Sequence, residues 1–331
     1  MTVSIRTTCL TLLLLFSASP AGAQGNAPLN LEQTIPLPDV RGRIDHMSLD
    51  AAGQRLFVSA LANNTVEVVD LKAGKRTNTI SGLQEPQGAL YVAGKDRLYV
   101  ASGKDGTVKM FDGTSLRLLK TIEYADDADN LRYDGSRERI YVGFGDGALG
   151  ELDIDGQKIA ETKLASHPES FQLERTSPHI YVNLPKSRKV AVVDRNAHSI
   201  VTSWGTGLLL GNYAMALDEA EHRLIVATRF PARLLVIDTG SGKIIQKLSA
   251  VGDCDDVFFD QARKRIYATG GEGAISVFEQ RTPDDYQEVV RVRTVKGART
   301  SFFSPELGRL YVAVPQQGAT AAMIQAFRVS P

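Results

Sequence analysis

The chain repeats one short pattern seven times: RLFV (55–58), RLYV (97–100), RIYV (139–142), HIYV (179–182), RLIV (223–226), RIYA (265–268) and RLYV (309–312). The third residues of these segments are separated by 42, 42, 40, 44, 42 and 44 positions. β-Branched and aromatic residues fill the pattern, which favours strands over helices. A repeat of this length indicates one supersecondary unit used seven times.

A second apolar segment follows in each of the first six repeats and ends in an acid. These segments are VEVVD (66–70), VKMFD (108–112), LGELD (149–153), VAVVD (190–194), LLVID (234–238) and ISVFE (275–279). Further apolar segments upstream and downstream bring each repeat to four short strands. The sequence therefore predicts an all-β fold, a seven-bladed β-propeller of four-stranded antiparallel blades.

The two ends of the repeat region complement each other. The seventh repeat stops after its third strand, MIQAF (323–327), and the segment LEQTIPL (31–37) stands alone before the first repeat. Sharing one blade between both ends buries two blade faces that would otherwise stay open. We therefore expect 31–37 to pair with 323–328 and close the ring.

These repeats resemble those of the bacterial YVTN-repeat propellers. The matching motifs are LFVSA (56–60) and IYVNL (180–184), with the hairpins VVDLKAGK (68–75) and VIDTGSGK (236–243). The resemblance covers about residues 31–328 and implies the propeller fold, whereas proteins with such repeats serve binding, surface and some enzymatic roles. WD repeats do not fit, because Trp204 is the sole tryptophan.

The first residues have the composition of an export signal. An apolar run at 10–18 leads to an Ala-x-Ala pattern that ends at Ala23. This is typical of a cleaved secretory signal and is too short for a membrane span. We expect a signal peptide at 1–23, a single propeller domain at 24–331, and a periplasmic or secreted location.

Charge and cysteine content exclude several classes of function. The chain has 38 Lys+Arg and 38 Asp+Glu, so no net charge attracts a nucleic acid, and we expect no such partner. With Cys9 inside the signal, Cys254 stands alone and no intrachain disulfide is expected. Motifs for nucleotide phosphates, zinc proteases, haem c attachment and serine hydrolases are absent from the sequence.

The two faces of such a ring carry different loops. Turns between strands 1 and 2, and between strands 3 and 4, lie on one face, and the remaining loops lie on the other. The 1–2 turns place an acid five residues before a base, which predicts the ion pairs Asp50–Arg55, Asp134–Arg139, Glu174–His179, Asp218–Arg223 and Asp260–Arg265. We interpret these recurrent charges, and the acids Asp70, Asp112 and Asp238 after strand 3, as structural.

The other face breaks the repetition. Twelve residues before the third residue of each repeat, the innermost strand begins, and the seven residues there are Asp45, Gln87, Asp129, Glu169, Tyr213, Asp255 and Arg299. We call this ring the mouth, because seven inner strands converge on one axis. Its four carboxylates repel one another unless they are hydrated, protonated or bridged by a cation.

The mouth and its neighbours supply the candidate site residues. Ligand-binding candidates are Asp45, His46, Gln87, Asn130, His167, Tyr213, Arg229 and Arg299. Oxygen donors for Ca²⁺ or another hard cation are Asp129, Glu169, Asn212 and Asp255. Catalytic candidates, which need a base or a charge beside the reaction, are His46, His167 and Arg299. A water-filled channel whose carboxylates only cap loops is the alternative.

Two functions stay open on the sequence. The favoured one is a monomeric, exported binding module that offers its polar funnel to a small ligand, cation or partner protein. The partner would dock on the face of the 2–3 and inter-blade loops. The alternative is a metal-dependent hydrolase, because the acidic rim is similar to the central cation site of gluconolactonase-like propellers, which have six blades. The lack of a recognisable catalytic set favours the binding module.

Overall fold

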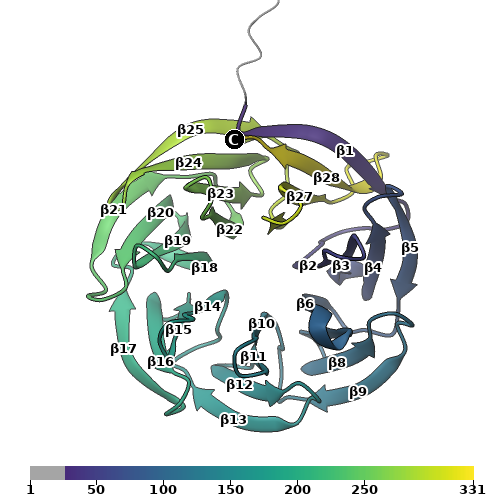
Figure 1. Ribbon diagram of the computed structural model, residues 1–331, viewed down its shortest axis with the longest axis horizontal. Coiled ribbons are helices and arrows are strands. Elements are labelled where there is room, and N and C mark those ends of the chain that lie inside the picture. The colour runs from purple at the N-terminus through teal and green to yellow at the C-terminus, as the bar shows by residue number, and fades with distance from the viewer. Residues whose placement is uncertain (1–26) are drawn as a thin grey trace, which may run out of the picture.

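The computed structural model describes residues 27–331, which form a closed ring of seven four-stranded antiparallel sheets (Figure 1). The predicted all-β propeller with seven blades is therefore confirmed. The signal expected at 1–23 lies outside the described residues. None of the described helices is long and apolar enough to cross a membrane.

The first six blades each use four consecutive strands, numbered outward from the axis. The first three blades contain β2 (Met47–Asp50), β3 (Arg55–Ala60), β4 (Thr65–Asp70), β5 (Lys75–Ile80), β6 (Pro86–Val92), β7 (Arg97–Ser102), β8 (Thr107–Asp112), β9 (Leu118–Glu123), β10 (Leu131–Asp134), β11 (Arg139–Phe144), β12 (Ala148–Asp153) and β13 (Lys158–Lys163). The next three contain β14 (Phe171–Leu173), β15 (His179–Leu184), β16 (Lys189–Asp194), β17 (Ser199–Gly205), β18 (Leu210–Asp218), β19 (Arg223–Phe230), β20 (Ala232–Asp238), β21 (Ile244–Ser249), β22 (Cys254–Asp260), β23 (Arg265–Gly270), β24 (Ala274–Thr282) and β25 (Asp285–Arg293). Two single-turn 3-10 helices, η1 (Leu61–Asn63) and η2 (Ala93–Lys95), lie in connecting loops.

The seventh blade joins both ends of the described chain. It contains β26 (Ser301–Ser304), β27 (Arg309–Val314) and β28 (Ala322–Val329), with β1 (Leu29–Leu37) as the outermost strand. β1 runs antiparallel to β28, and Ile35 lies opposite Ile324. The predicted closure is confirmed, and the pairing begins at Leu29, two residues before the expected start.

The repeated segments supply the core between the blades. Their third residues are all buried, namely Phe57, Tyr99, Tyr141, Tyr181, Ile225, Tyr267 and Tyr311. One core cluster joins Tyr267 and Ile275 of the sixth blade to Val312 and Phe327 of the seventh. Because each blade packs against its two neighbours, most of the buried apolar side chains lie between blades.

The charged hairpin ends pair only partly as expected. Asp50–Arg55 at 2.8 Å and Glu174–His179 at 3.4 Å are confirmed. The other three expected pairs are wrong, and their members pair instead as Asp134–Arg195, Arg139–Glu151, Arg223–Asp238, Asp260–Arg263 and Arg265–Glu279. The arginine that begins strand 2 lies between two strands that both end in an acid, as Arg223 lies between Asp218 and Asp238. The sequence alone does not indicate which of the two acids forms the ion pair with this arginine.

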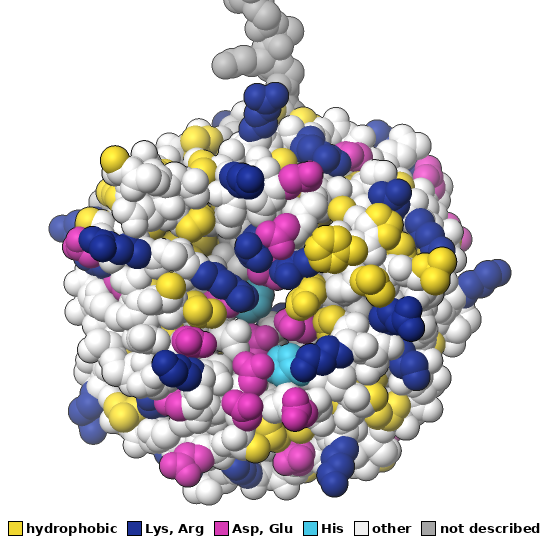
Figure 2. Space-filling model, turned by 180° about the vertical axis from the view of Figure 1, so that it is seen from behind, with side chains coloured by type: hydrophobic (Ala, Val, Ile, Leu, Met, Phe, Trp, Pro, Cys, Tyr) yellow, Lys and Arg dark blue, Asp and Glu magenta, His cyan; other side chains and the backbone are white. Residues whose placement is uncertain are grey.

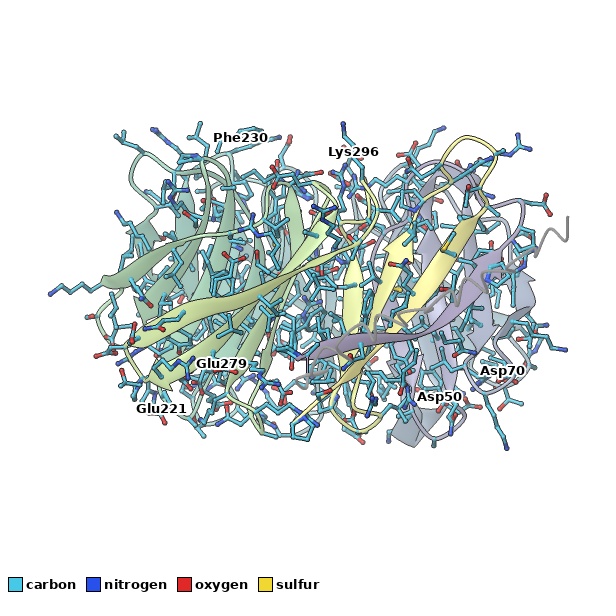
Figure 3. All side chains as sticks on the ribbon, turned by 90° about the horizontal axis from the view of Figure 1, so that it is seen from above. Asp50, Asp70, Glu221, Phe230, Glu279 and Lys296 are labelled. Atoms are coloured by element: carbon cyan, nitrogen blue, oxygen red, sulfur yellow. The ribbon has the colours of Figure 1, made fainter. Side chains whose placement is uncertain are left out.

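The two faces carry the loops that the sequence predicts. Figure 3 shows Phe230, from a 2–3 turn, and Lys296, from an inter-blade loop, at one edge of the disc. Asp50, Asp70, Glu221 and Glu279 lie at the opposite edge. The acids after strand 3 are structural as expected, since Asp70 accepts the backbone N–H of Ala73 at 2.7 Å.

Candidate functional site

The mouth is a hollow where acidic and basic side chains and histidines gather around the axis (Figure 2). Asp45, Asp129, Glu169 and Arg299 stand two residues before an inner strand, whereas Gln87, Tyr213 and Asp255 lie inside one. Backbone bonds fix these starts: the N–H groups of Asp129 and Glu169 donate to the carbonyls of Gly143 and Asn183, at 3.0 Å each. The scaffold thus holds charged side chains from different blades within reach of one another.

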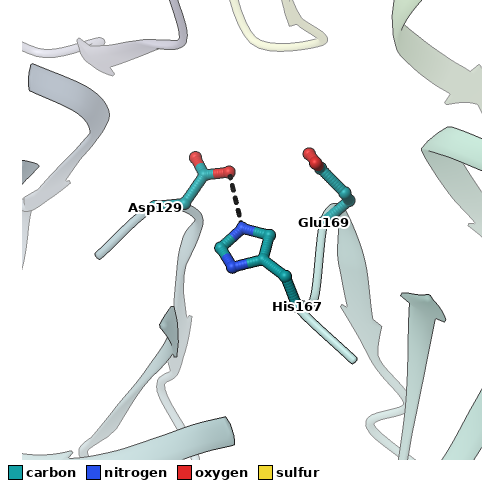
Figure 4. Close-up of side chains that lie close together, drawn as sticks. All are labelled: Asp129, His167 and Glu169. Atoms are coloured by element: carbon teal, nitrogen blue, oxygen red, sulfur yellow. Dashed lines mark ion pairs between the residues drawn. The ribbon is translucent and has the colours of Figure 1, made fainter. Parts of the chain in front are cut away.

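Three of these side chains converge on one point (Figure 4). One ligating atom each of Asp129, His167 and Glu169 lies within 4.8 Å of the other two. His167 Nδ1 is 2.6 Å from the carbonyl oxygen of Gly145, so this nitrogen donates its hydrogen there. The ring is thereby oriented so that Nε2 faces Asp129 Oδ2, at 3.9 Å.

Burial and neighbouring charges shift the pKa of all three groups. Burial opposes charge on His167, but the carboxylate of Asp129 and the carbonyl of Gly145 outweigh this and raise its pKa to about 9. Burial also opposes charge on Asp129, yet the neighbouring positive charges of His167, His46 and Arg43 lower its pKa. Burial and the charge of Asp129 raise the pKa of Glu169 to about 8. Glu169 is therefore the group with least to neutralise it.

A second histidine is fixed across the mouth. His46 Nδ1 lies 3.3 Å from Asp256 Oδ1, and its Nε2 lies 3.7 Å from Asp45 Oδ1. Burial opposes its charge, but Asp256 and Asp45 raise its pKa to about 10. Burial raises the pKa of Asp45 to about 7, although Arg43 pairs with it at 2.7 Å. An imidazole held protonated at neutral pH does not serve as a general base there.

The remaining rim charges are arranged in ion pairs. Arg229 contacts both Asp255 and Asp253, and its guanidinium stacks 3.9 Å from the ring centroid of Tyr213. Arg299 pairs with Asp253 at 3.0 Å. Burial raises the pKa of Asp255 despite Arg229 beside it. The two arginines thus neutralise one side of the mouth, and the Asp129–Glu169 side keeps its acidic excess.

The polar amides among the candidates separate into two groups. Gln87 joins the rim, because its Nε2 donates to Asp127 at 2.8 Å. Asn212 instead donates to Asn183 Oδ1 at 3.0 Å and to the carbonyl of Lys189 at 2.9 Å, within the blades. The structure therefore brings Asp129 and Glu169 together with His167, and it engages Asn212 and Asp255 elsewhere.

Several partners in the mouth escaped the sequence reasoning. Arg43, Asp127 and Asp253 each stand two residues before a mouth position, as His167 does. Because side chains alternate along an extended chain, a residue two positions earlier points the same way. The same seven-fold count, moved back by two, would have identified this outer ring.

Nuclear magnetic resonance titration should find His46 still an imidazolium at pH 8, with a midpoint near its pKa of about 10. The pKa of His46 in the folded protein lies above its value of about 6.5 in the unfolded chain. The ion pair with Asp256 therefore contributes its full stabilisation below about pH 6.5. Its contribution is lost as the pH rises through about 10. Asp256→Asn should lower the midpoint, and a wild-type midpoint between 6 and 7 would contradict the assignment.

Comparisons with known proteins support the fold. No family model and no curated protein matches the chain. A chain from the mitotic checkpoint complex is 13% identical, with a TM-score of 0.77 over 99% of this chain and 100% of its own length. A chain of Kuenenia stuttgartiensis hydrazine synthase is 16% identical, with a TM-score of 0.73 over 88% of this chain and 97% of its own. At such identities this protein is shown to share their propeller fold and nothing further.

Proposed function

We propose that this protein is a binding module that holds a divalent cation at its mouth through Asp129, His167 and Glu169. One observation carries the proposal: an imidazole nitrogen and two carboxylates converge within 4.8 Å, from adjoining blades. The Gly145 carbonyl orients the imidazole, which is how metal-binding histidines are commonly fixed. A cation there would also balance a negative charge on Glu169, which burial and Asp129 otherwise oppose.

The donor set favours one class of cation. Ca²⁺ takes oxygen ligands, whereas an imidazole with two carboxylates suits Zn²⁺ or Mn²⁺. We therefore replace the Ca²⁺ suggested by sequence with a transition-series ion. Binding would displace the protons that His167 and Glu169 hold at neutral pH, so uptake should release protons into the buffer.

The scaffold suits binding better than hydrolysis. A rigid ring with variable loops on one face is typical of modules that present a surface to another molecule. The hydrolase alternative needs a base beside the cation, and Asp45 and Asp256 keep the nearby His46 protonated. We also infer, from the sequence of 1–23, that the module is exported.

Isothermal titration calorimetry with ZnCl₂ and MnCl₂ tests the site. We expect one cation per chain, and His167→Ala should weaken its binding by more than about tenfold. His222→Ala is the matched control, because His222 is an exposed residue near a 1–2 turn on the opposite face. Absence of binding by either cation, or equal loss in both variants, would overturn the proposal.

A further inference from the structure

Inside the channel, a lone arginine stands among mainly apolar side chains. The residues three positions after the mouth positions form the next ring inward: Ser48, Leu90, Arg132, Gln172, Ala216, Phe258 and Phe302. Six of the seven line a single cavity, the exception being Ala216. Arg132 is the one ionisable member of this ring. No other residue of the ring carries a negative charge to balance its guanidinium.

Arg132 has no carboxylate within ion-pair distance among residues 27–331. Its guanidinium donates to the carbonyl of Leu131 at 2.8 Å and to Ser170 Oγ at 3.3 Å, and it lies 5.4 Å from the ring centroid of Phe171. Burial lowers its pKa, which the distant charges of Asp256 and Asp129 only partly offset. A guanidinium has five N–H donors, so most of its capacity remains for a ligand.

Two cavities meet at this arginine. One, of about 370 Å³, lies toward the mouth and is lined by Leu90, Phe258 and Phe302. The other, of about 660 Å³, reaches the face of the 1–2 turns and has walls that include Leu217 and Phe259. Arg132 and Gln172 line both. These volumes lie in the range of small-molecule sites, which combine apolar walls with a few polar groups.

A second polar group in the channel also lacks a partner. Asn130 is only 2% exposed, and neither its Oδ1 nor its Nδ2 has a hydrogen-bond partner in the described part of the chain. It lines the same cavity as Arg132. A buried amide without partners costs free energy, which a bound ligand with an acceptor oxygen would recover.

We propose that the channel binds a small organic monocarboxylate with an apolar body, through Arg132 and Asn130. The planar guanidinium matches a carboxylate, and the phenylalanine rings would contact the apolar part. The cavity has one cation without an acidic partner, and its other cation, His46, is already paired with Asp256. A doubly charged anion would therefore leave one charge unbalanced. The ligand would enter from the wider cavity, on the face opposite the metal site.

Calorimetric titration of the full wild-type chain with 2-naphthoate, and with its neutral isostere 2-naphthamide, tests the proposal. The two probes share the apolar body and differ in the charge that Arg132 would meet. We expect naphthoate to bind at least about tenfold more tightly than naphthamide, because a charge-assisted pair contributes that much. No binding of naphthoate, or equal affinities, would overturn it without any variant being needed.

A pair of variants identifies the residue responsible. Arg132→Gln should weaken naphthoate binding about tenfold or more and leave naphthamide unchanged. Arg233→Gln is the control, because Arg233 also lacks an ion pair within 27–331 and lies outside both cavities. Naphthoate binding that survives Arg132→Gln would contradict the site. Arg132→Gln should bind Zn²⁺ as wild type does. Failure of the carboxylate site can therefore be distinguished from failure of the metal site.

Discussion

Deletion of residues 24–38 is expected to abolish the cooperative fold of the whole ring. The deletion removes β1, whose Leu29, Ile35 and Leu37 are all buried. Burial of such side chains contributes about 1.5–3 kcal/mol each, or roughly 5–9 kcal/mol for three. Most domains have only about 5–15 kcal/mol of stability. The loss also leaves the hydrogen-bonding edge of β28 open.

Thermal and urea unfolding, followed by circular dichroism, measure this effect. The matched control is Leu31→Ser, because Leu31 is 51% exposed on the same strand. The control should shift the free energy of unfolding by less than about 0.5 kcal/mol, as surface substitutions usually do. An unchanged melting temperature after the deletion would refute closure by β1.

Arg195→Met is expected to lower the free energy of unfolding by about 3–5 kcal/mol, because it leaves a buried carboxylate without its partner. Arg195 pairs with Asp134 at 2.9 Å, and both side chains are only 6% exposed. Arg195 also donates to the carbonyl oxygens of Glu174 and Ser177. Asp134 ends β10 in the third blade, so this ion pair links neighbouring blades.

A double variant separates the lost ion pair from lost packing. Asp134→Leu combined with Arg195→Met removes both charges and should recover much of the loss, because apolar groups replace buried ion pairs well. Arg175→Met is the control, since the Arg175 side chain is 90% exposed although it pairs with Glu219. A loss below about 1 kcal/mol for Arg195→Met would show that this ion pair behaves as an exposed one.

The fold was predictable because the same strand pattern occurs seven times in the sequence. Phe57, Tyr99 and Tyr311 recur in register, and each occupies the same buried position between blades. The incomplete seventh repeat likewise predicted the pairing of β1 with β28. A single repeat would not have distinguished a propeller blade from another small sheet. Seven repeats at a regular spacing indicate that all of them adopt the same four-stranded unit.

The mouth was predictable in position and only partly in its partners. Counting along the repeat placed Asp129 and Glu169 on one rim, and the structure brings them within reach of one another. Asn212 bonds Asn183 and the carbonyl of Lys189 within the blades, and β18 is irregular between Asn212 and Met215, which spacing alone does not reveal. The choice between partners, such as Arg229 with both Asp253 and Asp255, depends on side-chain rotamers that spacing does not encode.

The shared blade also constrains how the ring can form in time. Most strand pairs join neighbours in sequence, whereas Asn30 bonds Ser330 across 300 positions. Local hairpins can form early, but a contact of that separation carries the largest loop-closure entropy and slows folding. During synthesis β1 has no strand partner until β28 exists. The ring therefore completes only once the chain extends through β28, and a nascent chain that stops before it would expose unpaired strand edges that can join other chains.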